Sequence, residues 1–117
     1  GFGLLGHLSE MVEEHHTVLL EGNALPFIPG CEEYVEEFYL TAAAQRNRNH
    51  LQNRVEFCRI PFYVEELLFD PQTSGGLLIS MAPEEGERAL RQIAALGLPC
   101  GRIGRIVDRK EKSIYVR

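Results

Sequence analysis

Residues 67–79 have the sequence LLFDPQTSGGLLI, in which two apolar runs flank a polar loop that contains two glycines. The first run predicts the end of a helix, and the second, residues 76–81, predicts a buried strand. Helices and strands that alternate along a chain of this kind are typical of α+β domains. We therefore expect an α+β fold, a mixed sheet with helices packed on it.

The flanking sequence predicts further elements of both kinds. Apolar residues at helical spacing favour helices at residues 4–15, 31–44 and 83–96, with a short one opening at Pro61 and the polar run 45–53 ending the second. Short apolar or β-branched runs favour strands at residues 17–20, 55–60, 100–107 and 113–117. The last two strands are joined by a charged turn, and we expect them to pair.

Size and composition indicate one globular domain over residues 1–117. Hydrophobic residues make up 44% of the chain and charged residues 25%, as in ordinary soluble domains. No apolar run approaches the roughly 20 residues that a membrane span needs. The first seven residues lack the basic start of a signal peptide. We therefore expect no membrane partner.

Charge is distributed unevenly between the two parts of the chain. Residues 1–45 contain no Lys or Arg, whereas residues 46–117 hold all 12 basic residues, and the net charge is −5. A nucleic-acid binder normally presents a net basic face, so this balance is against nucleic acid as a partner. The basic cluster at residues 46–59 either faces a phosphate-bearing ligand or forms a solvated loop.

Cysteine and histidine spacing indicates no metal site. Cys31, Cys58 and Cys100 are scattered and form no Cys-x-x-Cys pair, which is against a zinc knuckle. Scattered free cysteines are typical of the reducing cytoplasm, where we expect the protein to be. The histidines His7 and His15 lie too far apart along a helix to share one ion.

The 70–76 loop is the first candidate binding site. Thr73 and Ser74 carry hydroxyl groups, and Gly75 and Gly76 leave backbone N–H groups uncovered, so the loop can cradle phosphate oxygens. Asp70 is suited to capping a turn or to approaching a metal–nucleotide. The same residues also fit an ordinary Asp-Pro turn with a glycine bend.

The start of the chain is the second candidate. Gly1, Gly3 and Gly6 match the pattern G-x-G-x-x-G, but no strand precedes them, which is against a dinucleotide-binding fold. Small residues here allow close approach of another surface. A helix that begins here presents free N–H groups, which form an anion site.

Four stretches together resemble one enzyme family. DPQTSGGLL at residues 70–78 resembles the C-terminal signature of selenophosphate synthetase, also called selenide, water dikinase. GFGLLGH at residues 1–7 resembles the family's other C-terminal signature. QRN at residues 45–47 resembles a weaker element that usually follows Pro and Gly, and GRIGRIV at residues 101–107 resembles the closing strand.

The resemblance implies that residues 1–117 are the C-terminal domain of an enzyme that makes selenophosphate from selenide, ATP and water. Its products are AMP and phosphate, its cofactor is magnesium, and its superfamily is that of aminoimidazole ribonucleotide synthetase. The implied partners are an N-terminal ATP-binding domain and, for the parent enzyme, a second copy in a homodimer. Residues expected near the ligand are Gly3, Gly6, His7, Asn47, Asp70, Gln72, Thr73, Ser74, Gly75 and Gly76.

The family's catalytic Cys or selenocysteine, its neighbouring Lys and most magnesium carboxylates belong to the N-terminal part. We therefore expect no catalytic residue, no bound cofactor and no activity in this chain alone. Two alternatives stay open. One is a sister ATP-dependent enzyme of the superfamily, such as thiamine monophosphate kinase or a hydrogenase maturation protein. The other is a stand-alone ligand-binding or interaction module. The sequence upstream of Gly1 would discriminate between them.

Overall fold

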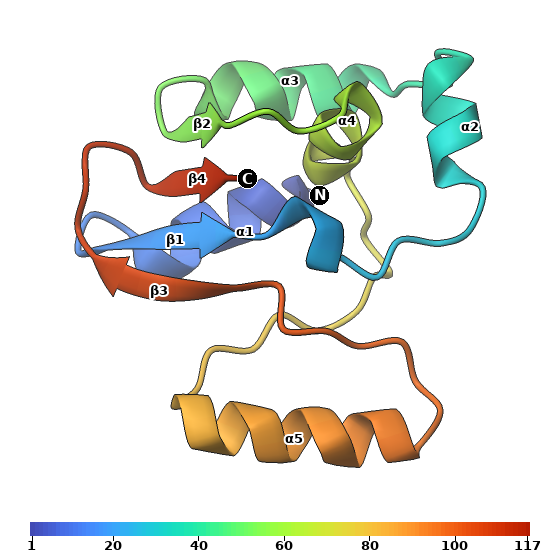
Figure 1. The fold of residues 1–117 in the computed structure, drawn as a ribbon. Coiled ribbons are helices and arrows are strands. Elements are labelled where there is room, and N and C mark those ends of the chain that lie inside the picture. Colours follow the sequence, from blue (N-terminus) through green and yellow to red (C-terminus); the bar gives the residue numbers. More distant parts are fainter.

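The computed structural model describes all of residues 1–117 and contains a four-stranded mixed sheet with the strand order β2-β4-β1-β3. The strands are β1 (His16–Leu20), β2 (Val55–Phe57), β3 (Gly104–Asp108) and β4 (Ile114–Val116). β4 lies parallel to both of its neighbours, whereas β3 is antiparallel to β1. The α+β fold with a mixed sheet is therefore confirmed (Figure 1).

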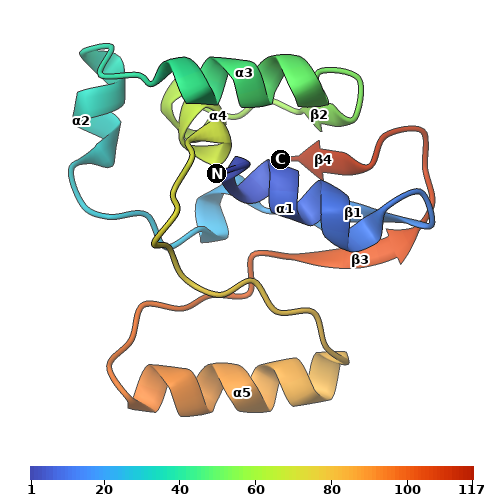
Figure 2. The same ribbon diagram turned by 180° about the vertical axis from the view of Figure 1, so that it is seen from behind.

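Three helices pack together and contribute to the core, and one of them lies directly on the sheet. They are α1 (Gly3–Val12), α3 (Ala42–Leu51) and α4 (Phe62–Phe69). α1 contacts β1 and β4 directly, and Figure 2 shows it running along these strands. The largest side chains excluded from solvent come from these helices and the two central strands: Leu5, Leu20, Leu51, Leu68, Phe69 and Ile114. Burial of one such side chain stabilises the fold by roughly 1.5–3 kcal/mol.

The closing strands do not pair with each other, so that prediction is wrong. β3 and β4 lie on opposite sides of β1 and each bonds to it. The fully buried Thr17 explains the arrangement, because its Oγ1 accepts a hydrogen bond from Lys110 N (2.9 Å) and donates one to Lys112 O (2.8 Å). The charged turn is thus held over β1 and carries the chain across it.

The predicted helix at residues 31–44 is also wrong, because the chain forms two helices there. α2 spans Cys31–Glu36, and α3 then runs through the polar stretch that we expected to end a helix. Thr41 begins α3 by accepting a hydrogen bond from Ala44 N at its Oγ1 (3.0 Å). Ala44 and Leu51 are the buried residues of α3. The polar residues that we expected to end a helix therefore belong to a helix that is mostly exposed.

α2 ends in a Schellman motif. Phe38 N donates to Val35 O and Tyr39 N donates to Tyr34 O, each at 2.9 Å. The rings of Tyr34 and Tyr39 supply the hydrophobic contact that often accompanies this motif, with centroids 5.8 Å apart. Phe38 occupies the left-handed position (φ 63°), where glycine is usual. The chain accepts this conformational cost and ends the helix there, so α2 cannot continue into α3.

Residues 76–81 form no strand, although their apolar composition favoured one. Leu77 is 91% exposed, and Ile79 and Met81 are also exposed. The predicted helix that follows is confirmed as α5 (Pro83–Ala95), which ends before Gly97 (φ 74°). No residue of α5 is buried, and the helix lies apart from the other elements (Figure 1). A strand needs a hydrogen-bonding partner, and an apolar run does not by itself provide one.

The remaining connection is a short 3₁₀ helix, η1 (Gly22–Ala24), after β1. None of the helices is both long enough and apolar enough to cross a membrane.

α5 begins with Glu84 and Glu85, whose negative charges are stabilised by the positive end of the helix dipole. Glu87 Oε1 lies 3.4 Å from Arg102 Nη1.

Candidate functional site

The start of the chain lies against the loop that follows α4. A methyl group added at Gly1 would lie 3.3 Å from Thr73 Cγ2 and 3.4 Å from the carbonyl carbon of Pro71. A methyl group at Gly3 would lie 2.8 Å from Phe69 O. The two candidate stretches, far apart in sequence, are therefore side by side in the fold.

Gly3 and Gly6 each lie too close to other atoms to carry a side chain, but their neighbours differ. Gly3 enters α1 with φ +70°, and its Cα faces the backbone of Phe69. A methyl group at Gly6 would lie 2.5 Å from Phe2 Cβ, so a larger residue would displace Phe2. Gly3 and Gly6 are thus required by the packing of this chain itself.

Asn47 connects the two stretches from the middle of α3. Its Nδ2 donates to Phe69 O (2.9 Å) and to Gly1 O (3.2 Å). Phe69 is the last residue of α4, where carbonyl groups lack partners within the helix. The side chain therefore satisfies one helix-end carbonyl while it holds the first residue of the chain beside it.

Asp70 begins the loop and is only partly exposed. Its Oδ1 accepts a hydrogen bond from Thr41 Oγ1 (3.4 Å), and its backbone carbonyl accepts one from Gln72 N (2.9 Å). Asp70 is therefore a turn residue, as the sequence allowed. Its carboxylate lies at the edge of the surface that the two stretches form.

Residues 73–76 present their polar groups to solvent. All four are exposed, and none of their backbone N–H groups donates a hydrogen bond within the chain. Neither Gly75 nor Gly76 has a positive φ, and a methyl group at Gly76 would meet no atom within 4 Å. These two glycines are therefore not required by the packing of this chain, in contrast to Gly3.

His7 belongs to α1 and does not join the loop. Its Nδ1 lies 3.4 Å from Glu10 Oε2, one turn along the same helix. Its ring meets Phe2 edge-on, with centroids 5.9 Å apart. The structure thus brings Gly1, Gly3, Asn47, Asp70 and Thr73 together and leaves His7 on the exposed side of α1.

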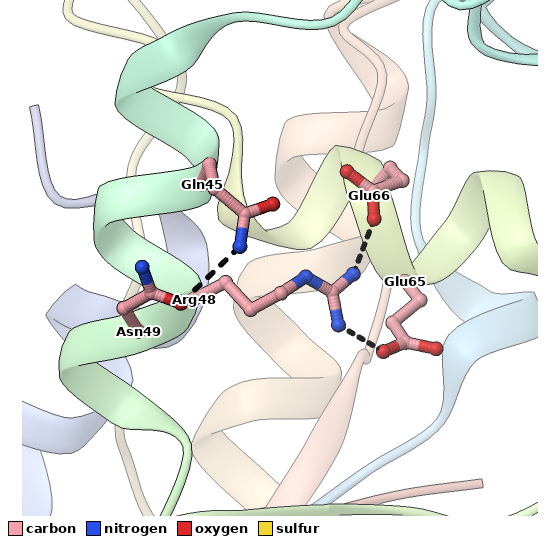
Figure 3. A network of polar contacts seen from close by, with 5 residues as sticks. All are labelled: Gln45, Arg48, Asn49, Glu65 and Glu66. Atoms are coloured by element: carbon pink, nitrogen blue, oxygen red, sulfur yellow. Dashed lines mark hydrogen bonds and ion pairs between the residues drawn. The ribbon is translucent and has the colours of Figure 1, made fainter.

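Arg48, which belongs to the basic cluster at residues 46–59, lies on α3 and bonds to α4. Its guanidinium bonds to both Glu65 and Glu66 (Figure 3). It also lies over the ring of Phe69, 4.7 Å from the centroid. Burial opposes its charge, but the hydrogen bonds and charges of Glu65 and Glu66 outweigh burial and hold the pKa of Arg48 above its usual value. The available signal was two consecutive glutamates in α4 opposite a basic cluster.

The family model for the AIR synthase related protein, C-terminal domain, matches residues 1–117. The chain belongs to this family. It is similar to the selenide, water dikinase of Agathobacter rectalis, with 50% identity over 117 residues. It is also similar to enzymes of the same name from Desulfitobacterium hafniense strain Y51 (44% over 117 residues) and Pseudomonas aeruginosa (38% over 117 residues).

Coverage differs between this chain and its relatives. The three alignments include 99%, 100% and 99% of this chain but only 34%, 34% and 33% of the relatives. The AIR synthase related domain thus spans about a third of the length of the curated relatives that it matches. The residues that the fold brings together, Gly1, Gly3, Asn47, Asp70 and Thr73, all lie within that third.

The domain does not by itself provide a magnesium cage. No three His, Cys, Asp or Glu side chains converge to hold an ion. Asp70 is the one carboxylate of the loop, and its oxygen already accepts a bond from Thr41. Magnesium sites in nucleotide enzymes combine one or two carboxylates with water and phosphate oxygens. The donors here do not fit a complete site.

Replacing Gly3 by alanine is expected to lower the free energy of unfolding by about 2–4 kcal/mol. A positive φ costs a side chain about 1–2 kcal/mol, and overlap with the backbone of Phe69 adds to this cost. Urea unfolding measures the loss. Two controls separate the two costs. Gly97→Ala carries only the cost of the positive φ, and Gly76→Ala carries neither the positive φ nor a steric overlap. A loss at Gly3 no larger than at Gly97 would contradict the close packing.

Proposed function

We propose that this chain is the C-terminal domain of a selenide, water dikinase and supplies one wall of its nucleotide site. The observation that carries the proposal is the meeting of residues 1–3 with residues 70–73, joined through Asn47. Whole-chain similarity to enzymes named selenide, water dikinase supports the same reading. The parent enzyme converts selenide, ATP and water to selenophosphate, AMP and phosphate.

The domain's part in this reaction is to bind and orient phosphate groups. Phosphoryl transfer depends mainly on positioning and on neutralising oxygen charge. The unbonded N–H groups of residues 73–76 and the hydroxyls of Thr73 and Ser74 are donors of the required kind. Free N–H groups at the start of α1 add a second set beside them.

The remaining two thirds of the parent supply what this domain lacks. We assign to that part the nucleophilic Cys or selenocysteine, its Lys and the carboxylates that hold magnesium with ATP. We also propose that the parent is a homodimer located in the cytoplasm, where the free thiols of Cys31, Cys58 and Cys100 stay reduced.

The test compares the parent enzyme with residues 1–117 alone. Each is incubated with ATP, magnesium and selenide, and AMP and selenophosphate are followed by chromatography and phosphorus NMR. The parent is expected to form both products only when selenide is present, and residues 1–117 alone are expected to form neither. AMP formation by the domain alone would overturn the division of roles. A parent that ignores selenide but phosphorylates thiamine monophosphate would be a sister enzyme.

A further inference from the structure

The amide of Asn47 has both of its N–H groups committed within the protein. A carboxamide nitrogen carries two donors, and these meet the carbonyl oxygens of Phe69 and Gly1. No donor of Nδ2 is left for a ligand. This arrangement conflicts with a role for the Asn47 nitrogen in nucleotide contact and requires another explanation.

Arg48, the next residue of α3, contacts side chains of α4. Arg48 bonds to Glu65 and Glu66 and covers the ring of Phe69, while Asn47 takes the backbone carbonyl of Phe69. Figure 3 shows Arg48 reaching from α3 to the two glutamates of α4. α3 thus fixes the point at which the 70–76 loop leaves the helix.

The loop has few other attachments. Apart from bonds within residues 67–72, the only polar tie is the one from Thr41 to Asp70, and this bond is long at 3.4 Å. The first residues of the chain depend on Asn47 in the same way, because Gly1 O has no other hydrogen bond. Loss of the amide would therefore remove both hydrogen bonds that hold Gly1 and the end of α4 together.

We propose that Asn47 is a positioning residue that sets the distance between the 1–6 and 70–76 stretches, so that they bind one phosphate group together. The inference rests on the proposed function and deepens it. Binding then requires the two stretches to be held together before the nucleotide arrives. A displacement of about 1 Å in such a site can cost roughly 100-fold in rate.

The decisive variant is Asn47→Asp in the full-length parent. It keeps the size of the side chain but replaces two donors by a carboxylate that faces two carbonyl oxygens. The matched control is Asn49→Asp, which adds the same charge to the exposed side of the same helix and affects only a bond to Gln45. Each protein is studied at a temperature well below its melting transition, so that only folded enzyme is compared.

Two measurements are made on each variant. Steady-state kinetics give kcat and KM for ATP, and NMR order parameters of the backbone amides report the mobility of residues 1–6 and 70–76. Asn47→Asp is expected to lower kcat/KM for ATP on the order of 100-fold. It is also expected to lower the order parameters of both stretches together. The control is expected to match the wild type in both measurements.

The outcomes separate the inference from the proposed function. A lower melting temperature with kcat/KM within about twofold of the wild type would make Asn47 merely structural and overturn the positioning role. Lower order parameters in only one of the two stretches would also overturn it. If the wild-type parent forms no AMP with selenide, the proposed function fails, and the order parameters still decide whether Asn47 couples the two stretches.

Discussion

Gly75→Val is expected to lower turnover of the parent enzyme by about 100- to 1000-fold, the usual cost of losing one preorganised donor to a developing oxyanion. The structure offers no steric reason for a folding defect. Gly75 has no positive φ, and the atoms nearest to an added methyl group are Gln72 O at 3.6 Å and Gln72 Cβ at 3.8 Å. The branched side chain would instead cover the surface that a phosphate must approach.

The experiment measures turnover and melting temperature on the same sample. Gly86→Val is a suitable control, because an added methyl group there also meets only an ordinary contact, Met81 Cγ at 3.6 Å, and Gly86 lies on α5 away from the loop. The control is expected to keep wild-type turnover. A Gly75→Val enzyme that melts earlier but turns over normally when folded would show that Gly75 only shapes the loop.

Phe69→Ala is expected to destabilise the domain by about 3–5 kcal/mol, the usual cost of emptying a large core position. Phe69 is 1% exposed and meets Phe57 edge-on, with centroids 5.7 Å apart. Arg48 would also lose the ring over which its guanidinium lies. The expected fall in melting temperature is roughly 10–20 °C for a chain of this size.

The control for Phe69 lies at the other end of the same helix. Phe62 is 49% exposed, so Phe62→Ala is expected to cost less than about 1 kcal/mol. Differential scanning calorimetry of both variants compares one aromatic truncation inside the core with one at its edge. Similar losses for the two would mean that Phe69 does not occupy the centre of the core.

Most helices and strands were predictable because their apolar spacing reflects burial. Thr17 and its β-branched and aliphatic neighbours predicted β1. Pro83 and Gly97 predicted where α5 begins and ends. The failures have a common physical origin in contacts between distant residues. α3 carries polar side chains because Asn47 and Arg48 bond to other elements, which made a helix resemble a loop.

The site was predictable only in part. Short motifs drew attention to Gly3 and to the loop after Asp70, because small residues and hydroxyls have few other reasons to gather. Their meeting depends on how α1 packs against α4, which no local pattern specifies. The pairing of Arg48 with Glu65 and Glu66 was hidden for the same reason, since each charge alone resembles an ordinary surface residue.

The position of β4 has a consequence for how the domain folds during synthesis. Ile114 and Val116 are completely buried, and β4 lies between β1 and β2, which do not bond to each other. A ribosome adding about 5–20 residues per second therefore completes both flanking strands well before the strand that joins them. Until residues 114–116 leave the exit tunnel, Val18 can pair only with Ile106 of β3, Val55 has no strand partner, and the nascent sheet remains open to chaperones.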